Sequence, residues 1–350
     1  MNEEPENKET ALNEVNDDLY ERFSIIIDKG QEPLRIDKFL MARIENATRN
    51  KLQRAINAGL VLVNGKECKS NYKIKPLDAI IIYSDLNPEE TDVVPENIPL
   101  NIVYEDADIM VVNKPAGLVV HPGSGNYRGT LLNGVAWHLR QIDPELTEEK
   151  LPRFGLVHRI DKNTSGLLVL AKSDVAMRQL AKQFFDHTVK RQYLALVWGD
   201  VLNDTGTIVA HVGRNLRHRK LFEAYPEGDH GKEAITHYRV VERFNYVTMV
   251  ECVLETGRTH QIRVHMKYLG HPLFNDDFYG GDKILKGTVY ARYKQFVDNC
   301  FAICPRQALH AKTLGFIHPT TGKEMFFDTE LPDDMREVIE KWRKYVVVER

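Results

Sequence analysis

The sequence predicts an α+β protein with two domains, in which a small N-terminal domain precedes a larger one built on a mixed, mainly antiparallel β-sheet with flanking helices. Three observations lead to this prediction. Helical apolar spacing followed by a hairpin signal fills residues 23–86, and proline and acidic residues crowd residues 87–100. Apolar strand-like runs separated by short turns extend through residues 101–350.

Residues 1–22 should form a disordered acidic tail. Residues 1–21 carry eight acidic side chains, one basic side chain and few large apolar ones, a composition that buries too little surface to fold. The whole chain has a net charge of −3, whereas the chain without these residues has a net charge of +4. This mild positive charge permits a nucleic-acid partner without requiring one.

Residues 23–86 should contain a short strand at Phe23–Ile27, then two helices and a small sheet. Apolar residues recur at helical spacing in RIDKFLMARI and again in RNKLQRAINAG. Asn64-Gly65 between alternating apolar residues predicts a tight hairpin. The segment carries eleven basic and seven acidic side chains, so its charge is +4 within 64 residues. On charge alone, a solvated helix face explains this excess as well as a phosphate-binding surface does.

The order of residues in this segment resembles the S4 domain, an RNA-binding module of ribosomal proteins and RNA-modifying enzymes. The resemblance runs from RIDKFL through ATRNKLQRAINAGLVLVNGKECKSNYKIKPLDAI and covers most of residues 34–82. It implies binding of structured RNA through backbone contacts, with little base readout. The candidate phosphate contacts lie on the second helix and beside the hairpin: Arg49, Lys51, Arg54, Lys66 and Lys69.

Residues 87–100 are interpreted as a linker, and residues 101–350 as a domain in which strands alternate with single helices. The clearest helices are predicted at 174–187, capped by Ser173, and at about 259–269. The strongest strands are NIVYE, IMVVNK, GLLVLAK, YLALVWG, THYRVVERF and YVTMVECVLE. A short turn joins the last two, which implies antiparallel pairing.

We predict neither a metal site nor a cofactor. Cys300 and Cys304 have three residues between them and no second ligand pair nearby, so buried free thiols are favoured over zinc. His260 and His265 would diverge by about 140° on a helix and cannot form a metal-binding face. Neither a run of roughly 20 apolar residues that could span a bilayer nor a secretory signal is found. We therefore expect a cytoplasmic protein.

The segment GLVHRIDKNTSGLLVLAKS, residues 155–173, should be a strand, an exposed turn and a second strand. Asp161 is the one carboxylate of the turn and lies between the cations Arg159 and Lys162. We expect it to stay ionised, which suits nucleophilic or electrostatic work better than general acid catalysis. From this stretch alone, an aspartate that caps a surface turn and pairs with Arg159 is the alternative.

HRIDKNTSG resembles the H-R-L-D-x-x-T-S-G signature of the RluA family of pseudouridine synthases, with Ile160 in place of leucine. The resemblance implies isomerisation of uridine to pseudouridine in RNA, without a cofactor, and a catalytic role for Asp161. The substrate-binding candidates within the signature are His158, Arg159 and Thr164. Arg159 would hold the flipped backbone or fill the vacated stack.

Two further segments resemble motifs of the same family. KRQYLALVWG resembles the strand with the active-site tyrosine, which implies that role for Tyr193. Tyr193, Ala195 and Val197 should share one face of that strand. ETGRTHQIRVHMKYLGHPL resembles the motif whose arginine pairs with the catalytic aspartate, which implies a pairing of Arg263 with Asp161. A guanidinium at this position can form a bidentate pair with the carboxylate.

The run HPGSGNYRGTLLNGVAWHL most resembles the D-type (RluD) members of the family, which implies a hairpin of large-subunit (23S) ribosomal RNA as substrate. Another ribosomal RNA site or a transfer RNA is the alternative substrate. Two rival functions are a non-catalytic S4-type ribosome-assembly factor and a retaining hydrolase, which would need a second carboxylate about 5 Å from the first. We expect a monomer whose partner is structured RNA, in ribosomal RNA or a pre-ribosomal particle, and not a membrane.

Overall fold

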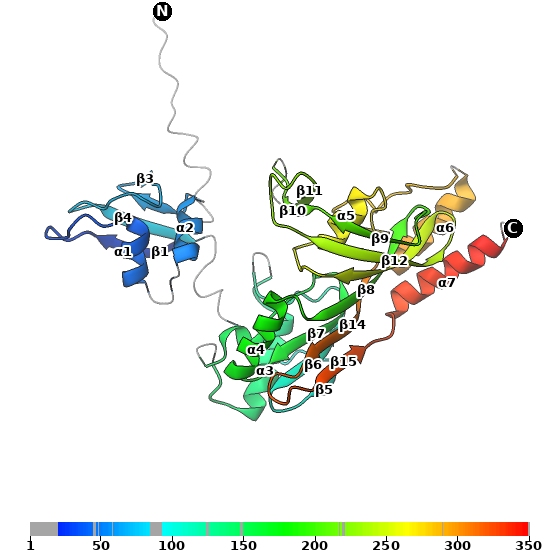
Figure 1. Cartoon of the computed structure of the whole chain (residues 1–350), viewed down its shortest axis with the longest axis horizontal. Helices are drawn as coiled ribbons and strands as arrows, with labels where there is room; N and C mark the ends of the chain where they lie inside the picture. The colour runs from blue at the N-terminus through cyan, green and yellow to red at the C-terminus, as the bar shows by residue number, and fades with distance from the viewer. Residues whose placement is uncertain are drawn as a thin grey trace, which may run out of the picture. The chain divides into compact units, whose positions relative to one another are not determined.

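The computed structural model describes residues 20–44, 47, 49–57, 59–84, 93–123, 126–147, 150–216, 218, 221–288 and 290–348 (Figure 1). The chain divides into two compact units. The first takes in the described residues up to Ser84 together with Gly123–Tyr127, and the second takes in Val93–Pro122 and the described residues from Arg128 onward.

The first unit combines two helices with a small antiparallel sheet, as predicted. Its elements are β1 (Tyr20–Ile26), α1 (Ile36–Arg43), α2 (Arg49–Asn57), β2 (Val61–Val63), β3 (Lys66–Glu67) and β4 (Ala79–Ser84), and the strands lie in the order β1-β4-β2-β3. Asn64 and Gly65 both adopt positive φ, 51° and 74°, in the turn between β2 and β3. These conformations explain why the sequence has Asn-Gly at this hairpin.

The predicted boundaries on either side of this unit need correction. The disordered tail was expected to extend to residue 22, but β1 begins at Tyr20; residues 1–19 lie outside the described residues. The linker was expected to span residues 87–100, of which 87–92 also lie outside the described residues. Val93 is buried in the core of the second unit, and the side-chain amide of Asn133 donates to the carbonyl of Val94 at 2.7 Å. The rest of the predicted linker therefore packs on the second unit.

The second unit is built on a nine-stranded sheet, in the order β5-β6-β7-β14-β8-β13-β12-β9 with β15 paired to β14. The pairing of β7 with β14 is parallel and the other strand pairs are antiparallel. This confirms a mixed, mainly antiparallel sheet. The strands are β5 (Ile102–Glu105), β6 (Ile109–Lys114), β7 (Ser165–Ala171), β8 (Lys190–Trp198), β9 (Thr205–Val209), β12 (Ile235–Arg243), β13 (Val247–Leu254), β14 (Leu309–Ile317) and β15 (Glu324–Asp328).

Helices and a separate hairpin complete the second unit. Helix α4 begins at Asp174 behind the predicted cap, because the Ser173 hydroxyl accepts the N–H of Ala176. The remaining elements are α3 (Leu131–Ile142), the short 3-10 helix η2 (Pro152–Gly155), α4 (Asp174–Phe185), β10 (His211–Arg214), β11 (Phe222–Tyr225), α5 (Gln261–Tyr268), α6 (Ala291–Ile303) and α7 (Asp333–Val348). Among the described residues, no helix is both long and apolar enough to cross a membrane.

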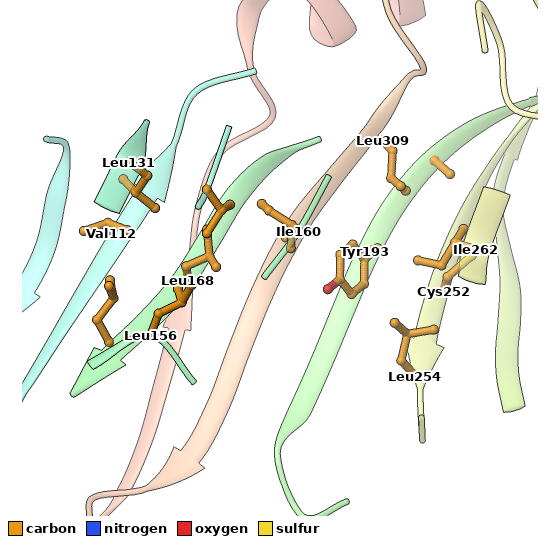
Figure 2. Close-up of a cluster of buried hydrophobic side chains, with 14 of the residues drawn as sticks. Val112, Leu131, Leu156, Ile160, Leu168, Tyr193, Cys252, Leu254, Ile262 and Leu309 are labelled. Atoms are coloured by element: carbon orange, nitrogen blue, oxygen red, sulfur yellow. The ribbon is translucent and has the colours of Figure 1, made fainter. Parts of the chain in front are cut away.

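Strand β8 has a buried core on each of its faces. Tyr193, Ala195 and Val197 contribute to one core, as predicted from the alternation, whereas Leu194 and Trp198 contribute to the other. Figure 2 shows the first of these cores, in which Tyr193 lies with residues of several elements. A strand with both faces buried is fixed in register, so the direction of the Tyr193 side chain is fixed as well.

The four cysteines are free thiols, as expected. Cys252, Cys300 and Cys304 are buried, and burial raises the pKa of each thiol to about 12. A thiol with such a pKa is uncharged at neutral pH and is a poor nucleophile. These three side chains therefore serve the packing of the core.

Candidate active site

Asp161 lies in the turn that leads into β7, and the strand behind it is anchored at its first two residues. The Ser165 hydroxyl is hydrogen-bonded to Nδ1 of His310 on β14 at 2.9 Å. Gly166 has a φ of 114°, and a Cβ at this position would lie 2.2 Å from the carbonyl oxygen of Ala311. Only glycine allows the two strands to approach so closely, which gives a physical reason for the Ser-Gly pair of the motif.

A buried lysine holds the turn from one side. Nζ of Lys114, at the end of β6, donates to the carbonyls of Pro115, Leu118 and Lys162 at 2.8, 2.8 and 2.9 Å. Burial lowers the pKa of this side chain to about 7. Three carbonyl acceptors match the three N–H donors of an ammonium group, so these hydrogen bonds favour the charged form.

A buried arginine holds the turn from the other side. Nη1 of Arg306 donates to the carbonyl of Asn163 at 2.9 Å, while Nε and Nη2 form a bidentate pair with Asp334 on α7 at 2.7 and 2.9 Å. Thr164 is buried, and its hydroxyl accepts a long hydrogen bond, 3.4 Å, from the side chain of Gln307. The turn is thereby connected to the C-terminal helix.

The Asp161 carboxylate is paired with Arg263, as the resemblance implied. Its Oδ2 accepts from Nη1 of Arg263 at 3.0 Å, and the two side chains are 22% and 4% exposed. The bidentate geometry that the sequence allowed is not found for this pair. The bidentate partner of Arg263 is Asp276, whose two oxygens accept from Nε and Nη2 at 2.8 Å each.

Asp276 was not predicted from the sequence. Its side chain is fully buried, and the structure gives it the strongest contacts of the Arg263 guanidinium. Burial alone would lower the pKa of Arg263, but the hydrogen bonds and charges of Asp276 and Asp161 outweigh burial and raise it. The one signal in the sequence was an acidic pair within the otherwise apolar run HPLFNDDFYGG.

His260 is a second residue of the site that sequence reasoning missed. Its Nε2 lies 3.8 Å from Oδ2 of Asp161, and its Nδ1 lies 2.7 Å from the hydroxyl of Tyr279. That hydroxyl accepts the backbone N–H of Phe222, so its own proton is free to be donated to Nδ1. The imidazole then presents Nε2–H toward Asp161. Burial lowers the pKa of His260, which favours this neutral form.

A cleft of about 500 Å³ brings the predicted site residues together. Its lining includes all six of them: His158, Arg159, Asp161, Thr164, Tyr193 and Arg263. Tyr193 is buried, and among the described residues its hydroxyl has no hydrogen-bond partner. A second cleft of about 280 Å³ shares Arg159, Asp161 and Arg263 with the first. The carboxylate therefore faces a space that can take a ligand, rather than an ordinary surface turn.

His158 and Arg159, the two polar residues before Asp161 in the motif, differ in their surroundings. Arg159 is exposed and lines both clefts. His158 stacks on Phe184 with 4.3 Å between ring centroids, and its Nε2 accepts the backbone N–H of Val169 at 3.1 Å. Burial lowers the pKa of His158 to about 3, so the ring is neutral at physiological pH. One nitrogen of His158 is thus already used to support β7.

One group of side chains among the described residues places potential metal ligands within 4.8 Å of one another, namely Asp106, Asp108 and His318. His318 Nδ1 accepts the backbone N–H groups of Thr320 and Thr321, so Nε2 carries the proton and donates to Asp106. Its imidazole has no free lone pair for a cation. These residues are absent from the lining of both clefts, and we interpret them as structural.

The predicted RNA contacts of the first unit are partly described. Lys66 and Lys69 are exposed. Nε of Arg49 donates to the buried carboxylate of Asp37 at 3.3 Å, so this arginine also stabilises the unit itself. The side chains of Lys51 and Arg54 lie outside the described residues.

Comparison with known proteins decides the family. Residues 108–268 match the model of the RNA pseudouridylate synthases, and residues 34–80 match that of the S4 domain. A protein of Chlorobaculum parvum named as an uncharacterized RNA pseudouridine synthase is 46% identical, over 91% of this chain and 96% of its own length. The chain belongs to the RNA pseudouridylate synthase family. It is thus an isomerase that acts on uridine in RNA, and the alternative of a non-catalytic assembly factor is not favoured.

Other pseudouridine synthases show the same relationship. Ribosomal large subunit pseudouridine synthase D of Zymomonas mobilis is 41% identical to this synthase, over 86% of this chain and 92% of its own length. The structure of human RNA Pseudouridylate Synthase Domain Containing 4 matches with a TM-score of 0.55 and 23% identity, over 69% of this chain and 93% of that one. This second likeness supports the fold.

Proposed function

We propose that this pseudouridine synthase modifies uridine in a hairpin of large-subunit ribosomal RNA, with Asp161 as its catalytic carboxylate. One observation supports this choice of catalytic residue: Oδ2 of Asp161 lies 3.0 Å from Nη1 of the buried Arg263, in a cleft that Tyr193 also lines. The choice of RNA is supported by relatives named as large-subunit synthases, 40 to 42% identical over at least 86% of this chain.

In this proposal the target nucleotide leaves its stack and enters the cleft, at a cost of a few kcal/mol. A cleft of about 500 Å³ is within the range that small-molecule ligands occupy. Arg159, exposed at the clefts, holds the displaced backbone or fills the vacated stack. His158 and Thr164 contribute to the wall.

Each remaining side chain then has a distinct role. Tyr193 offers its ring to the uracil for stacking, and its hydroxyl is available as a hydrogen-bond donor. Asp161 acts at the reacting nucleoside, while Arg263 holds the Asp161 carboxylate in place. Because Arg263 is itself fixed by Asp276, the carboxylate is positioned before the RNA arrives.

The substrate assignment is tested by mapping pseudouridine in a strain that lacks the gene. We expect specific positions of large-subunit ribosomal RNA to revert to uridine, and the wild-type gene, but not an Asp161→Asn allele, to restore them. Reversion confined to transfer RNA would contradict the proposed substrate. Unchanged RNA of every class would contradict the proposal as a whole.

We propose that the first unit binds RNA phosphates through exposed lysines. The Lys66→Gln, Lys69→Gln double variant should bind structured RNA more weakly, and its slope of log Kd against log salt should be smaller by about two units than that of the wild type, because two phosphate contacts are lost. At saturating RNA, kcat should not change. The matched control replaces two exposed lysines of the second unit, Lys323 and Lys344, by glutamine. Equal affinities and salt slopes for both double variants would contradict a specific role of the first unit.

We also propose that the enzyme acts as a monomer in the cytoplasm, where ribosomal RNA is processed. Asp161, Tyr193 and Arg263 all come from one chain, so the cleft needs no residue of a second copy. Light scattering during size-exclusion chromatography should give a mass near 40.3 kDa.

A further inference from the structure

Arg191 is a buried cation in the cleft that the proposed mechanism leaves unused. It lies on β8 two residues before Tyr193, so the two side chains leave the strand on the same side. Both line the cleft of about 500 Å³, and both are 7% exposed. Asp161 lines the same cleft, so the cleft contains Arg191, Tyr193 and the proposed catalytic carboxylate.

The Arg191 guanidinium has no anion beside it among the described residues. Its Nε is buried without a hydrogen-bond partner, and Nη2 has a single long contact, 3.5 Å, with the carbonyl of Glu255. Burial accordingly lowers the pKa of Arg191. The other buried guanidinium of the cleft, that of Arg263, is paired with Asp161 and Asp276. A buried charge without a partner is costly, which points to a ligand that supplies the missing negative charge.

The surroundings of the guanidinium are shaped to hold it. Its carbon lies 5.5 Å from the centroid of the Phe184 ring. A Cβ at Gly257 would lie 2.8 Å from Nη1, so the glycine leaves room that any other residue would fill. The neighbouring His158 ring is stacked on Phe184, and an imidazole cannot supply the missing negative charge, because it is either neutral or positively charged.

We infer that Arg191 is a further catalytic residue, which stabilises the negative charge of the uracil when it is detached from the sugar. This inference rests on the proposed placement of uridine against Tyr193. A backbone phosphate is the less suitable ligand, because it would remain near the exposed Arg159, whereas Arg191 lies in the buried part of the cleft.

The chemistry of the isomerisation requires such a group. When the C1′–N1 bond breaks, its electron pair stays on the base, and the resulting charge spreads over N1 and the ring carbonyls. C1′ is left short of an electron pair beside the Asp161 carboxylate, and C5 of the rotated base supplies that pair when the new C–C bond forms. The proton on C5 then passes to solvent and N1 takes up a proton from solvent, so atoms and electrons balance. A fixed guanidinium in a site of low dielectric stabilises that transient anion more than it stabilises neutral uridine.

The test compares uridine with 5-fluorouridine at the target position of an RNA that the wild-type enzyme converts. Fluorine withdraws electrons and stabilises the detached base, so it reduces the need for a cation. Single-turnover loss of the N-linked nucleoside, followed by nuclease digestion and mass spectrometry, measures the chemical step for both RNAs. For Arg191→Gln we expect the single-turnover rate with uridine to fall by about 100-fold. With 5-fluorouridine the rate should fall by a factor that is at least several-fold smaller.

Three further variants complete the design. Arg191→Lys keeps a cation and should retain most of the rate with both nucleosides. Arg191→Met also removes the cation, and it gives the same comparison of nucleosides if the glutamine variant is unstable. Lys190→Gln removes a positive charge from the adjacent, exposed position of β8, where Lys190 pairs with Glu324, and should leave both rates unchanged.

The outcomes separate the alternatives. If Arg191→Gln lowered the single-turnover rate equally with both nucleosides, Arg191 would have a structural role and the inference would be overturned. A higher Kd for RNA with an unchanged single-turnover rate would indicate a phosphate contact and overturn it as well. Failure of the wild-type enzyme to convert the RNA would instead count against the proposed substrate, so the two failures are distinguishable.

Discussion

The Asp161→Asn variant should convert uridine to pseudouridine at least about 10⁴-fold more slowly than the wild type, since loss of a catalytic nucleophile has effects of this order or larger. The amide has nearly the same shape, so the hydrogen bond from Arg263 can persist. It lacks the negative charge that the proposed chemistry requires. The measurement is single-turnover formation of pseudouridine in a hairpin RNA, with binding of the same RNA followed separately.

A suitable control for this variant is Asp108→Asn, which changes a carboxylate of the same unit outside both clefts. Its turnover should match that of the wild type. Melting temperatures of both variants should stay close to the wild-type value, because the Asp161 side chain is partly exposed and the turn is held by Lys114 and Arg306. Substantial turnover by Asp161→Asn would assign the chemistry to another residue.

Removal of Arg263 should damage both stability and catalysis. The Arg263→Met variant leaves the fully buried Asp276 carboxylate without its bidentate partner, and we expect the free energy of unfolding to fall by about 3–5 kcal/mol. Catalysis should be lost too, because Asp161 loses the group that positions it. Urea denaturation and single-turnover kinetics measure the two effects.

A double variant separates these effects. In Arg263→Met, Asp276→Asn the buried position no longer carries a charge, so most of the lost stability should return. Activity should not return, since nothing replaces the contact with Asp161. If the double variant regained activity together with stability, Arg263 would be a structural residue and its proposed role at the carboxylate would be wrong.

The motif residues could be named from the sequence because short segments resemble motifs of the family; their roles remain predictions. Asp161, Tyr193 and Arg263 were each identified from their own stretch, and the cleft brings them together. The alternation along β8 also gave the direction of Tyr193 correctly. The direction of a side chain can be predicted in this way where one strand carries the whole pattern.

The supporting residues could not be predicted in the same way. Asp276 contacts Arg263 from a loop thirteen positions further along the chain, and Lys114 on β6 holds the carbonyl of Lys162, so neither contact leaves a periodic signal. The linker prediction failed for a similar reason. Its proline and acidic content resembles that of an exposed connection, but Val93 packs into a core formed by distant segments.

The position of β14 has a consequence for the order in which the protein becomes competent during synthesis. This strand lies between β7 and β8, yet it is translated more than a hundred residues after both (Figure 1). A nascent chain therefore completes its S4 unit early, since domains fold as units from the N-terminus. The halves of the catalytic sheet stay unjoined until residue 317 has emerged. Growing chains should consequently attach to RNA well before they are able to modify it.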